Sequence, residues 1–283
     1  MTTIDPPRVA PQLASPLVST QWLADHLGSD SIVVLDATVQ QSRSAEGGAL
    51  WLSGLQHFLV HGHVPGAVFA DVLAQFSDAG AGHAFARPSV DRFEAAAASV
   101  GVDNDTTVIV YDTDGGEWAA RLWWLFRAFG HDRVAVLDGG YTKWFREDRP
   151  VHTGAVEPRE ALFIGTERPE SWAGRAEVEQ IAAGIAPGAL VFAGGDTIGG
   201  IPGSVTIAAS ALHDREAQRL LKPAVLRERF AAVLGAKRVV TYCAAGVAAA
   251  SDALALTLLG VPSVAVYDGP LEPWVDPAGG RAV

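Results

Sequence analysis

The chain has 283 residues, of which 49% are hydrophobic and 19% charged, and 21 basic against 32 acidic residues give a formal net charge of −11 at pH 7. This length and composition exclude a disordered chain and a disulfide-stapled miniprotein, and they predict one large or two ordinary domains. An acidic chain without a basic run argues against nucleic acid and against an anionic membrane surface as partners. Because no apolar stretch is long enough to span a bilayer and the first residues show no signal-peptide pattern, we expect a cytoplasmic protein.

Taken in chain order, short β-branched runs alternate with helical patterns. Ser19 or Thr20 can cap a first helix, and Ser89 or Asp91 can cap a second. Helices are expected over residues 22–27, 92–100 and 223–234, and strands over residues 32–35 and 107–111. Because these strands are apolar at consecutive positions, they favour a parallel sheet covered on both faces, and the fold class is α/β.

Two segments of the chain, residues 108–144 and 239–274, read alike. Each has a β-branched run, a small-residue loop, an apolar helix, a glycine, a second strand, Asp-Gly and a tryptophan. The glycine and the tryptophan are 14 positions apart in both (130 to 144 and 260 to 274). We therefore predict a duplicated domain, with a first domain over 1–148, a linker over 149–172 and a second domain over 173–283.

The match extends upstream, where Pro65 pairs with Pro202 and Asp36 with Phe192. From Asp36 to Pro65 is 29 positions and from Phe192 to Pro202 is 10, so the second half is shorter by 29 − 10 = 19 residues at this point. The second domain is therefore expected to lack a loop that the first one carries.

Cys243 is the single cysteine, so neither an internal disulfide nor a cysteine-cluster metal site can form. It is either a small buried hydrophobe or a reactive thiol. It follows a predicted strand and precedes an apolar helix, where parallel sheets bind ligands. The connecting loop is made of small residues: Ala244, Ala245, Gly246, Val247 and Ala248. Backbone N–H groups of such a loop favour an anion, so we expect a reactive thiol with a lowered pKa.

The other candidate patterns do not predict a metal or cofactor site. His57, His61 and His63 are spaced like metal ligands, but His63 lies in a Pro-Gly turn and carboxylates are scarce nearby, so no metal is expected. Neither a dinucleotide-binding glycine pattern nor a P-loop is present, and no cofactor is expected. Arg121 and the adjoining tryptophans are expected to pack in the core or between the domains.

The turn His63-Val64-Pro65-Gly66-Ala67, the pattern from Gly130 through Asp138-Gly139-Gly140 to Trp144, and the Cys243 loop resemble the rhodanese superfamily. Within it they resemble the tandem-domain sulfurtransferases of the thiosulfate and 3-mercaptopyruvate type. The resemblance covers nearly the whole chain. It implies two rhodanese-like domains, the first inactive with Asp112 at the cysteine position and the second carrying Cys243.

The resemblance also implies an activity. Cys243 would take a sulfane sulfur from a small anionic donor, thiosulfate or 3-mercaptopyruvate, and hold it as a persulfide. It would then pass the sulfur to cyanide or to a thiol, and the acceptor could also be a protein. His63 would either face the cleft and assist proton transfer, or only hold the Pro-Gly turn.

The Cys243 loop departs from the family pattern. Ala245 and Ala248 stand where mercaptopyruvate-type loops carry hydroxyl residues, and no charged residue follows the cysteine as in thiosulfate-type loops. The arginines expected in the second domain are absent. A catalytically weak or inactive tandem rhodanese that binds a partner therefore remains the alternative. A cysteine phosphatase is a poor match, because Ala249 stands where its loop would need an arginine.

Overall fold

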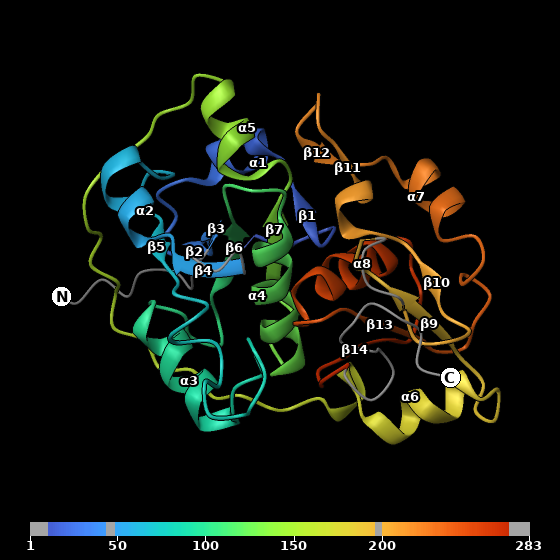
Figure 1. Cartoon of the computed structure of the whole chain (residues 1–283). Helices are drawn as coiled ribbons and strands as arrows, with labels where there is room; N and C mark the ends of the chain where they lie inside the picture. The colour runs from blue at the N-terminus through green and yellow to red at the C-terminus, as the bar shows by residue number, and fades with distance from the viewer. Residues whose placement is uncertain (1–10, 44–48, 196–199, 272–283) are drawn as a thin grey trace.

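The computed structural model describes residues 11–43, 49–195 and 200–271, and two α/β domains lie side by side in it (Figure 1). Trp274, which ends the second repeat, and residues 196–199 of the shortened loop lie outside the described residues. None of the helices in the described part of the chain is long and apolar enough to cross a membrane.

The first domain is built on a parallel sheet with the strand order β1-β7-β6-β2-β5. Its strands are β1 (Leu17–Val18), β7 (Val134–Leu137), β6 (Thr107–Tyr111), β2 (Ile32–Asp36) and β5 (Val68–Phe69). One face packs against α1 (Thr20–His26), α2 (Leu55–His61) and α5 (Gly140–Arg146). The other face packs against α3 (Val90–Ser99) and α4 (Glu117–Ala128). A separate hairpin pairs β3 (Val39–Arg43) with β4 (Ala49–Ser53).

The second domain repeats this plan with the order β10-β9-β13-β14-β8, again entirely parallel. Its strands are β10 (Val205–Thr206), β9 (Ala189–Phe192), β13 (Val239–Tyr242), β14 (Val264–Tyr267) and β8 (Trp172–Ala173). One face packs on α6 (Arg175–Ala182), and the other on α7 (Pro223–Arg229) and α8 (Val247–Leu258). Two 3₁₀ turns, Pro169–Ser171 and Ala209–Leu212, and the hairpin β11 (His213–Asp214) with β12 (Arg219–Leu220) complete it.

The two sheets have the same strand order. The strands β8, β14, β13, β9 and β10 of the second sheet correspond to β1, β7, β6, β2 and β5 of the first. This confirms the fold class: two tandem α/β domains, each a parallel sheet with helices on both faces. The expected caps are resolved as well, because Ser19 and Ser89 accept the N–H groups of Trp22 and Arg92 at 3.0 and 3.3 Å.

The helix expected to end at residue 234 is shorter. It ends at Arg229, and the backbone then continues in separate tight turns that bury Phe230 and Val233 in the core. The second sheet also begins one residue before the expected domain boundary at 173, because Trp172 already pairs with β14.

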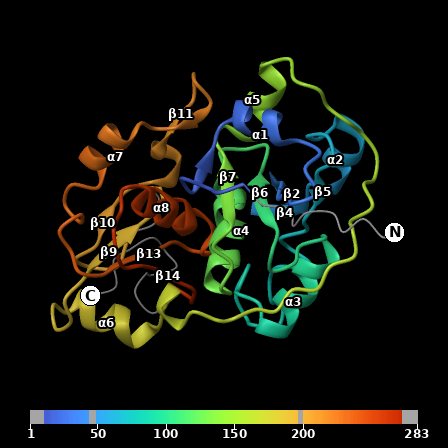
Figure 2. The same ribbon diagram turned by 180° about the vertical axis from the view of Figure 1, so that it is seen from behind.

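The segment between the domains runs extended along the first domain (Figure 2). Arg159 fixes it there by donating to the carbonyls of Gly101 and Asp30 at 2.8 and 2.6 Å. The N–H groups of Thr166 and Arg168 donate to the end of α4. The segment is therefore held by hydrogen bonds rather than by a fold of its own.

The domains meet through α4 and α8, which lie against each other across the interface (Figure 1). Nearly every residue of both helices is buried, and one apolar cluster runs from the first sheet through α4 to α8. Because α4 and α8 are the same helix of the repeat, their N-termini, which follow Asp112 and Cys243, open onto the same interdomain space.

Candidate active site

Cys243 leaves β13 at its carboxyl end, and α8 begins four residues later at Val247. Gly246 precedes the helix in the left-handed conformation, with φ +68°, which a glycine adopts without a steric penalty. The Cys243 sulfur accepts the N–H of Ala249, in the first turn of α8, at 3.4 Å. The loop thus directs backbone donors at the sulfur, as its small residues led us to expect.

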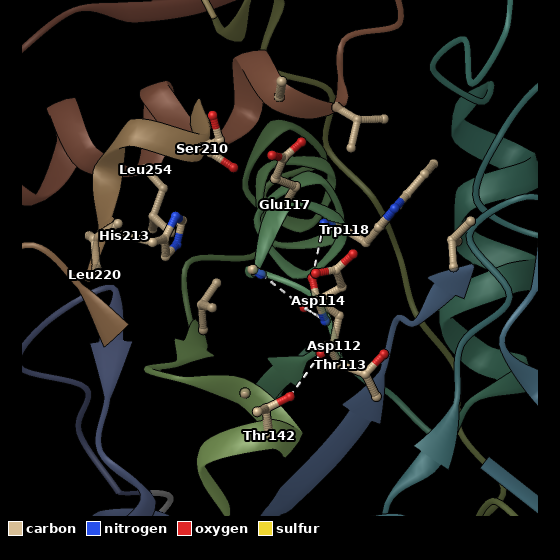
Figure 3. Close-up of a pocket in the computed structure, with 18 of the residues that line it drawn as sticks. Asp112, Thr113, Asp114, Glu117, Trp118, Thr142, Ser210, His213, Leu220 and Leu254 are labelled. Atoms are coloured by element: carbon tan, nitrogen blue, oxygen red, sulfur yellow. Dashed lines mark hydrogen bonds between the residues drawn. The ribbon is translucent and has the colours of Figure 1, made fainter. Parts of the chain in front are cut away.

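A pocket of about 760 Å³ lies between the two domains, and Cys243 forms part of its wall. The loop residues Ala244, Ala245, Val247 and Ala248 also line it, whereas Gly246 does not. The first domain contributes the segment from Asp112 to Trp118, and the second contributes Ser210, His213 and the β11–β12 hairpin (Figure 3). The structure therefore brings the predicted loop to a site that both domains build.

The expected low pKa of the thiol is wrong in direction. Burial raises the pKa of Cys243, which is only 6% exposed, because a desolvated thiolate is costly. The N–H groups of Ala249 and Ala245 lower this pKa, while the Glu117 carboxylate raises it and the Arg121 guanidinium lowers it. The sequence predicted the backbone N–H donors near the sulfur, but it did not predict that the sulfur would be buried.

Arg121, on α4, is fully buried behind the Cys243 loop. It donates to the Phe85 carbonyl at 2.7 Å and to Asp268 Oδ1 of the second domain at 3.2 Å. A Cβ on Gly246 would lie 3.1 Å from both Arg121 Nη1 and Asp268 Oδ1. Arg121 does pack between the domains as expected, and it also brings a positive charge from the first domain to the thiol.

Asp112 occupies in the first domain the place that Cys243 occupies in the second. Its carboxylate accepts four backbone N–H groups at 2.9–3.0 Å, those of Asp114, Gly116, Trp118 and Ala119. Burial raises the pKa of Asp112 to about 7, although these donors act in the opposite direction. The N-terminus of α4 is therefore occupied by the chain's own carboxyl group.

His63 does not line the pocket. It is fully buried, its ring nitrogens lie 3.0 and 3.2 Å from the carbonyls of Val64 and Gly154, and it stacks on Phe58. Its backbone pairs with His152 of the connecting segment. The suggestion that His63 faces the cleft is therefore corrected in favour of its structural role in the turn.

The histidines spaced like metal ligands do not converge. The rings of His57 and His61 lie 5.1 Å apart on α2, and His63 points to backbone carbonyls. Among the described residues, no group of three or more His, Cys, Asp or Glu side chains is placed to hold a metal ion.

Two titratable side chains that line the pocket, Glu117 and His213, were not predicted from the sequence. Glu117 begins α4 just as Val247 begins α8, so aligning the two helix starts would have placed it beside the Asp112 loop, and only the packing of the two domains brings it to the pocket that contains Cys243. His213 lies in a hairpin with no counterpart in the repeat pattern, and its Nε2 approaches Gly116 of the first domain. Burial lowers the pKa of His213.

Known proteins resemble this chain over nearly its whole length. Thiosulfate sulfurtransferase from Bos taurus is 32% identical, with 94% of this chain and 97% of that protein covered. 3-Mercaptopyruvate sulfurtransferase from Escherichia coli (strain K12) is 33% identical, with 91% and 94% covered. The crystal structure of the 3-mercaptopyruvate sulfotransferase SseA from Escherichia coli superposes with a TM-score of 0.80 at 29% identity, covering 90% of this chain and 98% of that one.

The Tum1 protein from Saccharomyces cerevisiae superposes with a TM-score of 0.79 at 20% identity over 95% of this chain and 99% of that one, which shows the fold alone. The sequence model of the rhodanese-like domain matches residues 19–147 and 196–277, one stretch in each half of the repeat. The chain therefore belongs to the rhodanese family of sulfurtransferases.

Proposed function

We propose that this protein moves a sulfane sulfur from thiosulfate or 3-mercaptopyruvate to a thiophilic acceptor, cyanide or a thiol, through a persulfide on Cys243. The observation that carries this proposal is the position of Cys243, which lines the interdomain pocket and whose sulfur accepts a helix N-terminal N–H. The names of the full-length relatives support the same donors. A protein thiol is an acceptor of the same chemical kind.

The reaction has two displacements on sulfur. The Cys243 thiolate attacks the outer sulfur of thiosulfate, an S–S bond forms in the persulfide, the donor S–S bond breaks and sulfite leaves. With 3-mercaptopyruvate the C–S bond breaks instead, and the pyruvate carbanion takes the thiol proton. The acceptor then attacks the outer sulfur, and its new bond releases the Cys243 thiolate. No external oxidant or reductant is needed.

The loop contributes through its backbone. The N–H groups of Ala249 and Ala245 act on the Cys243 sulfur and stabilise a negative charge there. Ala245 and Ala248 offer no hydroxyl that could do so. Charge stabilisation at the persulfide therefore falls on these N–H groups and on Arg121 behind the loop.

The test uses the single thiol of the chain. Incubation with thiosulfate or 3-mercaptopyruvate should add about 32 Da, one sulfur atom, to the intact mass, because a thiolate accepts a sulfane sulfur. Cyanide should then remove this mass and release thiocyanate. Cys243→Ser should show neither event. If the wild-type protein also shows neither, the proposal is overturned.

The second candidate is a catalytically weak or inactive tandem rhodanese that binds a partner or regulates it. The alanines of the loop and the raised pKa of the buried Cys243 favour it. It predicts no mass gain and no thiocyanate above the level of Cys243→Ser. Under either candidate, the lone free cysteine supports a reducing, cytoplasmic location as part of the proposal.

A further inference from the structure

Glu117 carries a carboxylate in the pocket that contains Cys243. It is the first residue of α4, is partly buried, and lines the pocket beside Asp114 and Trp118 (Figure 3). In the described part of the chain, no hydrogen bond or ion pair to a basic side chain holds it. Burial and the nearby Asp114 charge raise the pKa of Glu117, and in its ionised form Glu117 raises the pKa of the Cys243 thiol.

The positive charges of the site do not balance Glu117. Arg121 is fully buried, does not line the pocket, and already forms an ion pair with Asp268 at 3.2 Å. The pocket arginines, Arg215 and Arg219, are exposed residues of the β11–β12 hairpin, where solvent screens them. Because Glu117 and Cys243 line the same pocket, a donor that approaches Cys243 enters the field of the Glu117 carboxylate.

Aromatic rings stand on the same side of the pocket. Trp51, Phe85 and Trp118 all line it and contact one another edge to face, with ring centroids 5.0–5.8 Å apart. Aromatic faces attract cations, and a carboxylate beside them adds to that attraction. The wall that carries Glu117 is thus suited to an ammonium group and unsuited to a dianion.

We propose that Glu117 is a specificity-determining residue, whose carboxylate disfavours dianionic donors such as thiosulfate and favours donors that carry an ammonium group near the sulfane sulfur, such as an aminothiol persulfide. In that reaction the Cys243 thiolate attacks the outer sulfur of the persulfide. The Cys243 S–S bond forms, the donor S–S bond breaks, and the aminothiol leaves as a thiolate that is protonated by water. The choice of donor rests on the proposed function, whereas the electrostatic role of Glu117 does not.

The first experiment measures the potential at Cys243 without sulfur transfer. The thiol is modified with 2-aminoethyl methanethiosulfonate, a cation, and with 2-sulfonatoethyl methanethiosulfonate, an anion. The ratio of the two rate constants cancels changes in the nucleophilicity of the thiol. Glu117→Gln should lower the cation-to-anion ratio roughly tenfold, because it removes one nearby charge. Glu117→Asp keeps the charge and should stay close to the wild type.

A matched control removes the same charge elsewhere. Glu157 is exposed and outside the pocket, so Glu157→Gln should leave the ratio within about twofold of the wild type. The second experiment compares kcat/KM for thiosulfate and for cysteamine persulfide. Glu117→Gln should raise the first relative to the second roughly tenfold.

The outcomes separate the two proposals. An unchanged labelling ratio in Glu117→Gln, or an equal change in Glu157→Gln, would overturn the role of Glu117. If the labelling ratio shifts but no donor adds sulfur to Cys243, the proposed function fails and the donor preference fails with it. If sulfur is added and the donor ratio is unchanged in Glu117→Gln, only the donor preference is overturned.

Discussion

The conformation of the Cys243 loop depends on a single residue, the left-handed Gly246. Gly246 turns the chain from β13 into α8, and its missing side chain leaves room for Arg121 and Asp268 behind the loop. A Cβ added to Gly246 would come within 3.1 Å of both the Arg121 guanidinium and the Asp268 carboxylate. The same residue thus sets the backbone donors around the sulfur and admits the buried charge from the first domain.

Gly246→Ala should therefore lower both stability and turnover. The left-handed φ and the two 3.1 Å approaches should cost about 1–3 kcal/mol in the free energy of unfolding. Displaced N–H donors should lower kcat/KM on the order of tenfold or more. Urea unfolding and thiocyanate formation measure the two effects. Gly235→Ala is the control, since a Cβ there meets no atom within 4 Å. Wild-type behaviour of Gly246→Ala would contradict this account of the loop.

Asp112 makes a second prediction at this scale. Both oxygens of its carboxylate accept N–H groups, and an amide nitrogen cannot accept them. Asp112→Asn should therefore lower the free energy of unfolding by about 1–3 kcal/mol, measured in urea. Asp114→Asn, at an exposed side chain, should change it by less than about 0.5 kcal/mol. Equal effects of the two variants would mean that the four hydrogen bonds do not hold the first loop.

At the scale of elements, Glu147 ties α1 to the end of α5. It accepts the Thr20 hydroxyl of α1 and the Arg149 guanidinium, each at 2.6 Å, and it also pairs with Lys143 of α5. Burial alone would raise the pKa of Glu147, but its bonds to Lys143, Thr20 and Arg149 outweigh burial and lower it to about 2. Glu147, Thr20, Lys143 and Arg149 thus connect α1 to the end of α5 on one face of the first sheet.

The stabilisation by Glu147 should depend on pH in a defined direction. Because its pKa is lower in the folded than in the unfolded chain, its contribution is present above about pH 4.5 and is lost as the pH falls toward 2. Glu147→Gln should cost about 0.5–1 kcal/mol at pH 7, since the side chain is partly exposed and solvent weakens its ion pairs. The difference from the wild type should shrink as the pH falls through 2 and vanish below it. A difference that persists there would point to packing rather than charge.

At the scale of the whole molecule, Asp268 joins the domains. It belongs to the second domain, and it accepts Arg121 Nη2 at 3.2 Å and the backbone N–H of Arg87 at 2.7 Å, both from the first. Arg87 and Arg121 also lie over the ring of Trp172, 5.3 and 5.5 Å from its centre. These contacts fix α4 against the Cys243 loop, so the pocket that contains Cys243 depends on the domain interface.

Asp268→Ala should leave the Arg121 charge buried without its partner, at a cost of about 3–5 kcal/mol in the free energy of unfolding. It should also speed alkylation of Cys243, because the interface that buries the thiol loosens. The matched control is Asp105→Ala, which removes a pair with Arg133 in which the Asp105 side chain is 99% exposed, and which should cost at most about 1 kcal/mol. Comparable losses in the two variants would show that the domains do not depend on the buried pair.

Periodicity, capping residues and repeated spacing in the sequence were enough to predict the α/β class, the duplication, the expected strands and caps, and the strand end that carries Cys243. These signals can be recognised in a sequence because they depend on neighbouring residues or on the comparison of two segments of the same chain. The sequence pattern overextended α7 beyond Arg229, because the buried turns at Phe230 and Val233 are apolar like the helix before them.

The charges and the solvent exposure around the thiol follow from how the two domains pack, which the sequence pattern did not show. Glu117 and Arg121 reach Cys243 from more than a hundred positions away, because α4 and α8 pack together. That packing also buries the sulfur, and burial reverses the pKa direction that the loop residues suggested. His63 could be assigned to the turn only once Gly154 and His152 were seen against it. Charge and solvation depend on which surfaces meet, and two domains in one chain can meet in ways that a linear pattern does not record.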